Sequence, residues 1–152
     1  MQFRNYIAEQ DREWLIQLCG RFADFPLPQR IEHAGFRKQQ MDWMVLDLEK
    51  AEQVHLLIAV LDGQRAGFIE MKAEEDWLTG EKQAYVSRIC TTEDMEGKGV
   101  GKALMTQAER WAAEQGFEGI SLNVFAGNTH AAAFYESLGY EKETIKMRKT
   151  LN

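Results

Sequence analysis

The spacing of apolar residues along the chain changes from a helical to a strand-like period after residue 50. Upstream, they recur every three or four positions, which predicts amphipathic helices. Downstream, short apolar runs and alternating residues predict strands, interrupted by two further helical stretches. In chain order the pattern predicts a strand at 2–7, helices at about 11–22 and 29–50, strands at 54–61, 66–72 and 85–91, a helix at 99–115, a strand at 120–124, a helix at 128–138, and one or two strands within 140–151.

Polar and glycine signals mark where several of these elements begin and end. Asp11 is expected to cap the first helix, and Gly35 to kink the second. Asp62-Gly63 predicts a tight hairpin between two strands. Gly116 and Gly139 are expected to end the last two helices.

The order of elements, β-α-α-β-β-β-α-β-α-β, indicates an α/β fold. The strands on both sides of the helix at 99–115 are expected to be parallel neighbours, joined by a right-handed crossover. The other strands can pair antiparallel, so we expect a mixed, mostly antiparallel central sheet of six to seven strands with helices on both faces. A length of 152 residues fits a single domain over 1–152.

Composition and charge argue against several classes of protein. Hydrophobic residues make up 45% of the chain and charged residues 28%, enough to bury a core without disulfides or a metal. Cys19 and Cys90 form no C-x-x-C pair, so we expect neither a disulfide framework nor a zinc site, and a reducing compartment fits. The start lacks the core of a signal peptide, and no apolar run has the length of a membrane span, so we expect a cytoplasmic protein without a membrane partner. A net charge of −6 argues against a nucleic acid as the partner.

The segment Glu96-Gly97-Lys98-Gly99-Val100-Gly101-Lys102 lies between a predicted strand and a predicted helix. Glycines let backbone N–H groups turn toward a ligand, and the helix start adds unpaired N–H groups and a positive dipole end. The combination predicts a site for a phosphate or pyrophosphate. A Walker A loop is excluded, because Glu96 stands at its first glycine and Ala103 replaces its hydroxyl residue. A dinucleotide-binding fingerprint is excluded, because Lys102 stands at its last glycine.

This glycine loop resembles the pyrophosphate loop of the GCN5-related N-acetyltransferase (GNAT) superfamily, whose pattern is Arg/Gln-x-x-Gly-x-Gly/Ala. The resemblance extends to the strands at 87–91 and 121–124 and to the segment at 128–140, which reads Asn-Thr-His-Ala-Ala-Ala-Phe-Tyr-Glu-Ser-Leu-Gly-Tyr. It implies the GNAT-like version of the mixed sheet described above.

Glu96 departs from the superfamily pattern, because it stands where the family usually has Arg or Gln. A carboxylate beside a pyrophosphate is repulsive. Either its side chain points away while Lys98 and Lys102 supply the positive charge, or the affinity for the coenzyme is weakened.

The resemblance implies that acetyl-coenzyme A binds as co-substrate along the strand and the glycine loop. The backbone of Ile89, Cys90 and Thr91 would bind the pantetheine arm, and a main-chain N–H there would stabilise the oxyanion. Asn128 would contact the coenzyme, although an Asn in that place is also a good helix N-cap. Tyr135 matches the residue whose phenol protonates the departing thiolate, and the alternative is a plain core aromatic. The loop residues expected to bind the pyrophosphate are Gly97, Lys98, Gly99, Val100, Gly101 and Lys102.

An ammonium acceptor must lose a proton before it attacks, and the sequence leaves the group that accepts this proton open. The candidates by location are Glu70, Glu81, Tyr85 and Asn123, of which Asn123 could at most orient a water that accepts the proton. Cys90 could carry an acyl group, but a strand cysteine with no histidine nearby in sequence is expected to be buried and inert. No metal-ligand spacing links the three histidines, which are His33, His55 and His130.

The resemblance implies an N-acetyltransferase that moves the acetyl group to an amine by direct attack in a ternary complex. The alternative is a non-catalytic module that binds or senses acetyl-CoA, and a homodimer is compatible with either. The acceptor is expected to be an amine of a small molecule or peptide near an aromatic set, namely Phe22, Phe25, Phe36, Trp43 and Trp77. An acidic run would attract a cationic acceptor, and the alternative is that this run is only a solvated face. The acidic run consists of Glu70, Glu74, Glu75, Asp76 and Glu81.

Overall fold

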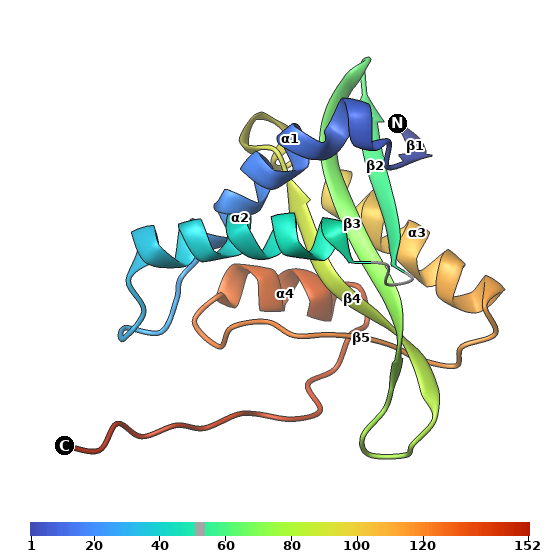
Figure 1. Cartoon of the computed structure of the whole chain (residues 1–152). Helices are drawn as coiled ribbons and strands as arrows, with labels where there is room; N and C mark the ends of the chain where they lie inside the picture. The colour runs from blue at the N-terminus through green and yellow to red at the C-terminus, as the bar shows by residue number, and fades with distance from the viewer. Residues whose placement is uncertain (51–53) are drawn as a thin grey trace.

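The computed structural model describes residues 1–50 and 54–152, and within them five strands form one sheet whose order follows the chain (Figure 1). The strands are β1 (Gln2–Asn5), β2 (His55–Leu61), β3 (Gln64–Glu75), β4 (Lys82–Thr91) and β5 (Ile120–Leu122). The helices are α1 (Ala8–Cys19), α2 (His33–Glu49), α3 (Val100–Glu114) and α4 (Thr129–Ser137), with two 3₁₀ turns, η1 (Gly20–Ala23) and η2 (Glu93–Met95).

Pairing within the sheet is antiparallel from β1 to β4 and parallel between β4 and β5. The predicted mixed, mostly antiparallel sheet is therefore confirmed, as is the parallel pair across α3. Asp62 and Gly63 form the two-residue turn between β2 and β3 with φ of 51° and 77°, the left-handed conformation that such hairpins need.

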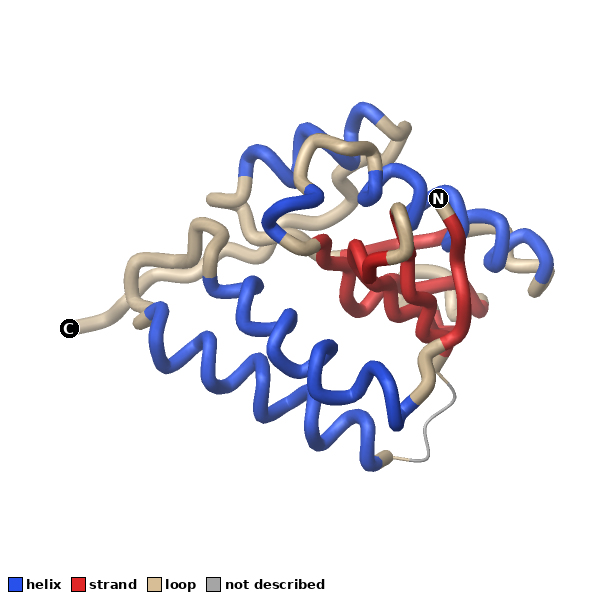
Figure 2. The backbone as a smooth tube through the Cα atoms, turned by 90° about the horizontal axis from the view of Figure 1, so that it is seen from above, coloured by secondary structure: helices blue, strands red, loops and turns tan. Residues whose placement is uncertain are grey.

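Helices cover both faces of the sheet (Figure 2), and each face has its own apolar core. Residues of α1 and α2 pack with Ile58 and Phe68 on one face, whereas α3 packs on Ala59 and Ile69 on the other. Neighbouring strand residues alternate between the two cores because successive side chains point to opposite faces. No helix within the described residues is both long and apolar enough to cross a membrane.

The expectation of six to seven strands is wrong, because the predicted strand or strands at 140–151 do not form. The chain leaves α4 as an extended segment that runs away from the body (Figure 1). Ile145 and Met147 are 75% and 89% exposed there. An alternating pattern shows that a segment can form a strand, but a strand also needs a neighbouring backbone to bond.

Several other expected boundaries differ from the structure by a few residues, and two of the differences change the description of the fold. The segment between β3 and β4 is shorter than expected, because β3 continues to Glu75 and β4 starts at Lys82. Helix α1 starts at Ala8, so Asp11 lies inside it rather than at its N-cap. The Asp11 side chain still accepts a hydrogen bond at the helix start, from the Ile7 N–H at 2.9 Å.

Asp11 is fully buried and ties α1 to the sheet. Its carboxylate accepts two hydrogen bonds from the Arg4 guanidinium, at 2.6 and 2.8 Å, and lies 3.4 Å from Arg65. The hydrogen bonds from Arg4 lower the pKa of Asp11 despite its burial. A carboxyl group whose pKa is lowered on folding stabilises the fold above its unfolded pKa, and this stability is lost as pH falls through the folded value.

We predict that Asp11→Asn lowers the free energy of unfolding at pH 7 by about 2 kcal/mol, because charge-assisted hydrogen bonds are lost in the interior. The difference from the wild type should shrink as pH falls below about 4, where the wild-type carboxyl group also becomes protonated. Urea unfolding between pH 3 and 7 measures both effects. Asp42→Asn is the control, because Asp42 forms an exposed pair with Lys38 and should cost less than about 0.5 kcal/mol.

Candidate functional site

The parallel pair of β4 and β5 separates soon after it forms. Its register joins Ala84 to Ile120 and ends with Val86 opposite Leu122. Strand β4 then continues to Thr91, while the chain after Leu122 turns away toward α4. Between these diverging segments the sheet is open.

The open edge of β4 presents the backbone groups of Ile89 and Thr91. The Thr92 N–H donates to the Ala66 carbonyl of β3 at 2.9 Å, so the backbone of Thr92 faces β3. Backbone groups alternate between the two edges of a strand, and those of Cys90 therefore also face β3. Ile89 and Thr91 face the other edge, where β5 has already left.

The glycine loop follows β4 and has the backbone that its sequence predicts. Gly97 and Gly99 have φ of 73° and 78°, in the left-handed region, and a Cβ added at either would meet no described atom within 4 Å. Gly99 is the N-cap of α3 and has no side chain to bond the first N–H groups of that helix. Met95 precedes the loop and anchors it, because its side chain is buried in the apolar core between α3 and the sheet. The space and donors suit a diphosphate.

A cavity of about 730 Å³ lies in the opening between β4 and β5. The aromatic side chains that line it are Phe22, Phe25, Phe36, Trp43, Tyr85, Phe125 and Tyr135. Four of the five aromatic residues expected near an acceptor are thus brought together. The fifth, Trp77, lies at the tip of the β3–β4 hairpin and is 78% exposed.

Tyr135 and Asn128 reach this cavity from α4 and its N-cap. Burial raises the pKa of Tyr135 to about 12, so its phenol is protonated throughout the neutral range. Its ring packs against Phe134 and Tyr140, with centroids 5.2 and 6.0 Å away. The Asn128 side chain accepts from the Ala131 N–H at 3.3 Å, which confirms its role as a helix cap.

A buried ion cluster lines the cavity opposite α4. Glu70 is 4% exposed and accepts hydrogen bonds from Ser87 Oγ at 2.5 Å and from Arg88 Nη1 at 2.9 Å. Arg88 Nη2 also bonds Asp47 of α2 at 2.5 Å. Burial lowers the pKa of Arg88, but the two carboxylates outweigh it and hold the pKa above its ordinary value.

Three of the four candidates for accepting the acceptor's proton line the cavity: Glu70, Tyr85 and Asn123. Asn123 donates from Nδ2 to the Tyr85 hydroxyl at 2.9 Å, so these two act as one polar unit. Glu81 instead precedes β4 at the hairpin tip, where its carbonyl accepts from the Asp76 N–H at 2.8 Å.

The comparisons with known proteins agree with this geometry. The model of the acetyltransferase (GNAT) family matches residues 18–140. The chain belongs to this family. A solved structure of a GNAT-like fold, described as a putative acetyl transferase from Pyrococcus furiosus, superposes with a TM-score of 0.77 at 24% identity and covers 99% of this chain and 100% of its own.

Two curated relatives are similar in sequence to this GNAT chain. An uncharacterized N-acetyltransferase of Bacillus subtilis, YdgE, is 34% identical over 89 residues, which are 59% of this chain and 55% of that protein. The mycothiol acetyltransferase of Streptomyces coelicolor is 33% identical over 148 residues, which are 94% of this chain and 43% of that protein. The chain therefore spans about half the length of these relatives.

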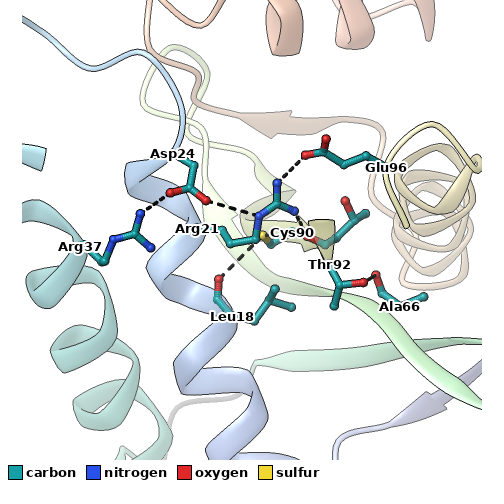
Figure 3. A network of polar contacts seen from close by, with 9 residues as sticks. Leu18, Arg21, Asp24, Arg37, Ala66, Cys90, Thr92 and Glu96 are labelled. Atoms are coloured by element: carbon teal, nitrogen blue, oxygen red, sulfur yellow. Dashed lines mark hydrogen bonds and ion pairs between the residues drawn. The ribbon is translucent and has the colours of Figure 1, made fainter. Parts of the chain in front are cut away.

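Within the GNAT frame, Glu96 departs from the usual Arg or Gln, and the structure shows its partner (Figure 3). Arg21 of η1 forms an ion pair with Glu96 through Nη2 and donates from Nη1 to the Thr91 carbonyl. Sequence reasoning missed Arg21. The unusual carboxylate of Glu96 indicates that a cation compensates it. The sequence does not say which one, because Arg21 lies 75 positions away and the chain has 18 lysines and arginines.

Cys90 is buried in the core beneath α1, as its sequence context predicts. Its Sγ lies 3.9 Å from the Leu18 carbonyl, and burial raises the pKa of the thiol to about 12. Cys19 is buried alongside, with its pKa also raised to about 12 by burial. A thiol that is protonated and inaccessible is a poor nucleophile, which argues against an acyl-cysteine route.

Proposed function

We propose that the protein is an N-acetyltransferase that moves the acetyl group of acetyl-CoA to an amine by direct attack. The observation that carries this proposal is the open edge of β4 leading into the glycine loop. A peptide-like pantetheine arm can bond the backbone groups of Ile89 and the N–H of Thr91 as an added strand would, while the Thr91 carbonyl is bonded by Arg21. The diphosphate then reaches the N–H groups at Gly97, Gly99 and the start of α3.

Residues of this chain are suited to each step of the reaction, namely attack by the amine, stabilisation of the oxyanion and protonation of the leaving thiolate. Acetyl-CoA supplies an activated acyl group, onto which the neutral amine forms a C–N bond as the C–S bond breaks. The proton that the amine loses goes to one of the candidates that line the cavity, namely Glu70, Tyr85 or a water oriented by Asn123. The free N–H of the β4 edge at Ile89 is suited to stabilise the oxyanion. Tyr135 donates a hydrogen bond, and then a proton, to the departing sulfur. Because its pKa of about 12 exceeds that of a thiol, this donation is expected only as the thiolate develops.

We predict that Gly99→Val weakens binding of coenzyme A by more than about tenfold, because a β-branched residue resists the φ of 78° that shapes the loop. Isothermal calorimetry on the folded variant measures this. Gly80→Val is the matched control, because Gly80 has a φ of 74° in the β3–β4 hairpin, away from the loop. Equal affinity for the Gly99 variant and the wild type would show that the diphosphate binds elsewhere.

Tyr135→Phe removes one hydroxyl group and little volume. We predict an unchanged Kd for coenzyme A and a fall in kcat of about 10²-fold. Below pH 10 the pH profile of kcat should have the same shape in the variant and the wild type, because the pKa of the phenol is about 12. Steady-state rates against pH measure this. Tyr140→Phe, whose hydroxyl donates to Glu109, is the control and should keep its turnover. A wild-type protein that binds coenzyme A but acetylates no amine would instead favour the binding or sensing module.

The acceptor that we propose is a cationic amine of a small molecule or peptide. A second hollow of about 480 Å³ meets the large cavity at Tyr85, Asn123 and Tyr135. The acidic residues that line this hollow are Glu74, Glu75, Asp76, Glu136, Glu141 and Glu143. Clustered carboxylates at a cleft mouth attract a cation and raise its encounter rate. We place the steering charges in this hollow rather than in the large cavity, because Glu70 is already paired with Arg88.

We predict that kcat/KM for the best amine falls as salt rises from 0.02 to about 0.3 M, because a steering field is screened over about 10 Å at 0.1 M. Glu74→Lys combined with Glu75→Lys should flatten that dependence. The control combines Glu9→Lys and Glu13→Lys on exposed α1 positions, which change the net charge equally. A neutral or anionic best acceptor, or equal effects of both double variants, would contradict steering by this hollow.

A further inference from the structure

Arg21 links the two parts of the coenzyme site that the chain builds separately. Its Nη1 bonds the Thr91 carbonyl, which lies on the open edge of β4, and its Nη2 bonds Glu96, the first residue of the glycine loop. The guanidinium therefore lies at the step from strand edge to loop (Figure 3). A coenzyme that follows the strand into the loop must pass this group.

We propose that Arg21 is a coenzyme-binding residue that contacts the diphosphate and replaces, from a different element, the cation that position 96 lacks. The inference rests on the proposed function, since it places a residue within that site. Glu96 then also favours coenzyme binding, because its carboxylate holds the Arg21 guanidinium at the loop.

The hydrogen-bonding capacity of Arg21 supports a further ligand. A guanidinium has five N–H donors in a planar fork that matches phosphate oxygens. One donor of Nη1 and one of Nη2 bond Thr91 and Glu96. The buried Nε has no hydrogen-bond partner among the described residues and lies 3.5 Å from an Asp24 oxygen. Nη1 and Nη2 each keep one further N–H that bonds no group among the described residues, and the side chain is 15% exposed. These two donors, rather than the buried Nε, are the ones that a ligand at the loop would meet.

The surrounding charges leave Arg21 available to such a ligand. Asp24 forms ion pairs with both Arg21, at 3.5 Å, and Arg37 of α2, so its charge is shared between the two arginines. The four side chains, Arg21, Arg37, Asp24 and Glu96, are therefore neutral as a group. Removing Arg21 would leave Glu96 as an uncompensated carboxylate beside the diphosphate, whereas Lys98 and Lys102 remain in either case.

The alternative is that Arg21 only clamps η1 to the end of β4. A clamp would affect every ligand of the strand edge alike. A diphosphate contact would affect coenzyme A and dephospho-coenzyme A, which keeps the diphosphate, but not pantetheine, which lacks it. These three compounds separate the two roles.

The test is calorimetry of Arg21→Gln with the three compounds at low salt. We expect the Kd of coenzyme A and of dephospho-coenzyme A to rise about tenfold to a hundredfold, as for the loss of a charge-assisted contact, and that of pantetheine to stay within about twofold. Adding Glu96→Gln to Arg21→Gln should recover part of the loss, because the uncompensated carboxylate is removed. Arg37→Gln is the matched control, since it breaks the same network without touching the loop, and it should bind like the wild type.

An equal loss for all three compounds, or a loss as large in Arg37→Gln, would overturn the proposal in favour of a clamp. If Arg21→Gln does not fold, Arg21→Lys is the second variant, because it keeps the positive charge beside Glu96 but loses the planar fork that matches phosphate oxygens. It should weaken binding of coenzyme A and dephospho-coenzyme A and leave pantetheine within about twofold, and an equal loss for all three compounds, or no loss for any, would contradict the proposal. A wild-type protein that binds no coenzyme A would overturn the proposed function as well, whereas normal binding by Arg21→Gln alongside loss in Gly99→Val would overturn this inference only.

Discussion

The early end of the β4–β5 ladder is the constraint around which the site is organised. Once β5 leaves at Leu122, the edge of β4 away from β3 has no neighbouring strand at Ile89 and Thr91 within the described part of the chain. Buried backbone groups need hydrogen-bond partners, so this edge must be satisfied by other means. Arg21 supplies a partner for Thr91, and the remaining groups face a cavity wide enough for an extended ligand. The chain that leaves β5 continues into α4, and Tyr135 of this helix lines the same cavity.

Local signals in the sequence predicted the parts of the site that depend on backbone conformation. The left-handed Gly97 and Gly99, the start of α3 and the Asn128 cap each follow from a few adjacent residues. The pairing of Arg21 with Glu96 could not be predicted, because it depends on how η1 docks against a loop 75 positions away. The predicted strands at 140–151 failed for a related reason, since their alternating pattern says nothing about whether a neighbouring backbone is in reach.

The acidic composition of the chain separates into two populations in the structure. Asp11 and Glu70 are buried, and each is bonded by arginine, Arg4 or Arg88. Such carboxylates cost free energy unless they are paired, so they fix the positions of their partners instead of attracting ligands. The carboxylates at the β3–β4 hairpin are exposed or half-buried, and their charges act through solvent. The sequence grouped Glu70 with that exposed run, and burial separates them.

The turn η1 connects the glycine loop to the large cavity. Arg21 contacts the strand edge and the glycine loop, and the next residue, Phe22, lines the large cavity. The two side chains share one short turn of four residues, from Gly20 to Ala23, packed against α2 through Arg37 and Asp24. A displacement of this turn therefore changes the wall of the cavity and the charge at the loop together. If η1 moves as one unit, a ligand that orders Arg21 also favours one arrangement of Phe22, and by linkage a ligand that packs on Phe22 favours that arrangement of Arg21 to an equal degree.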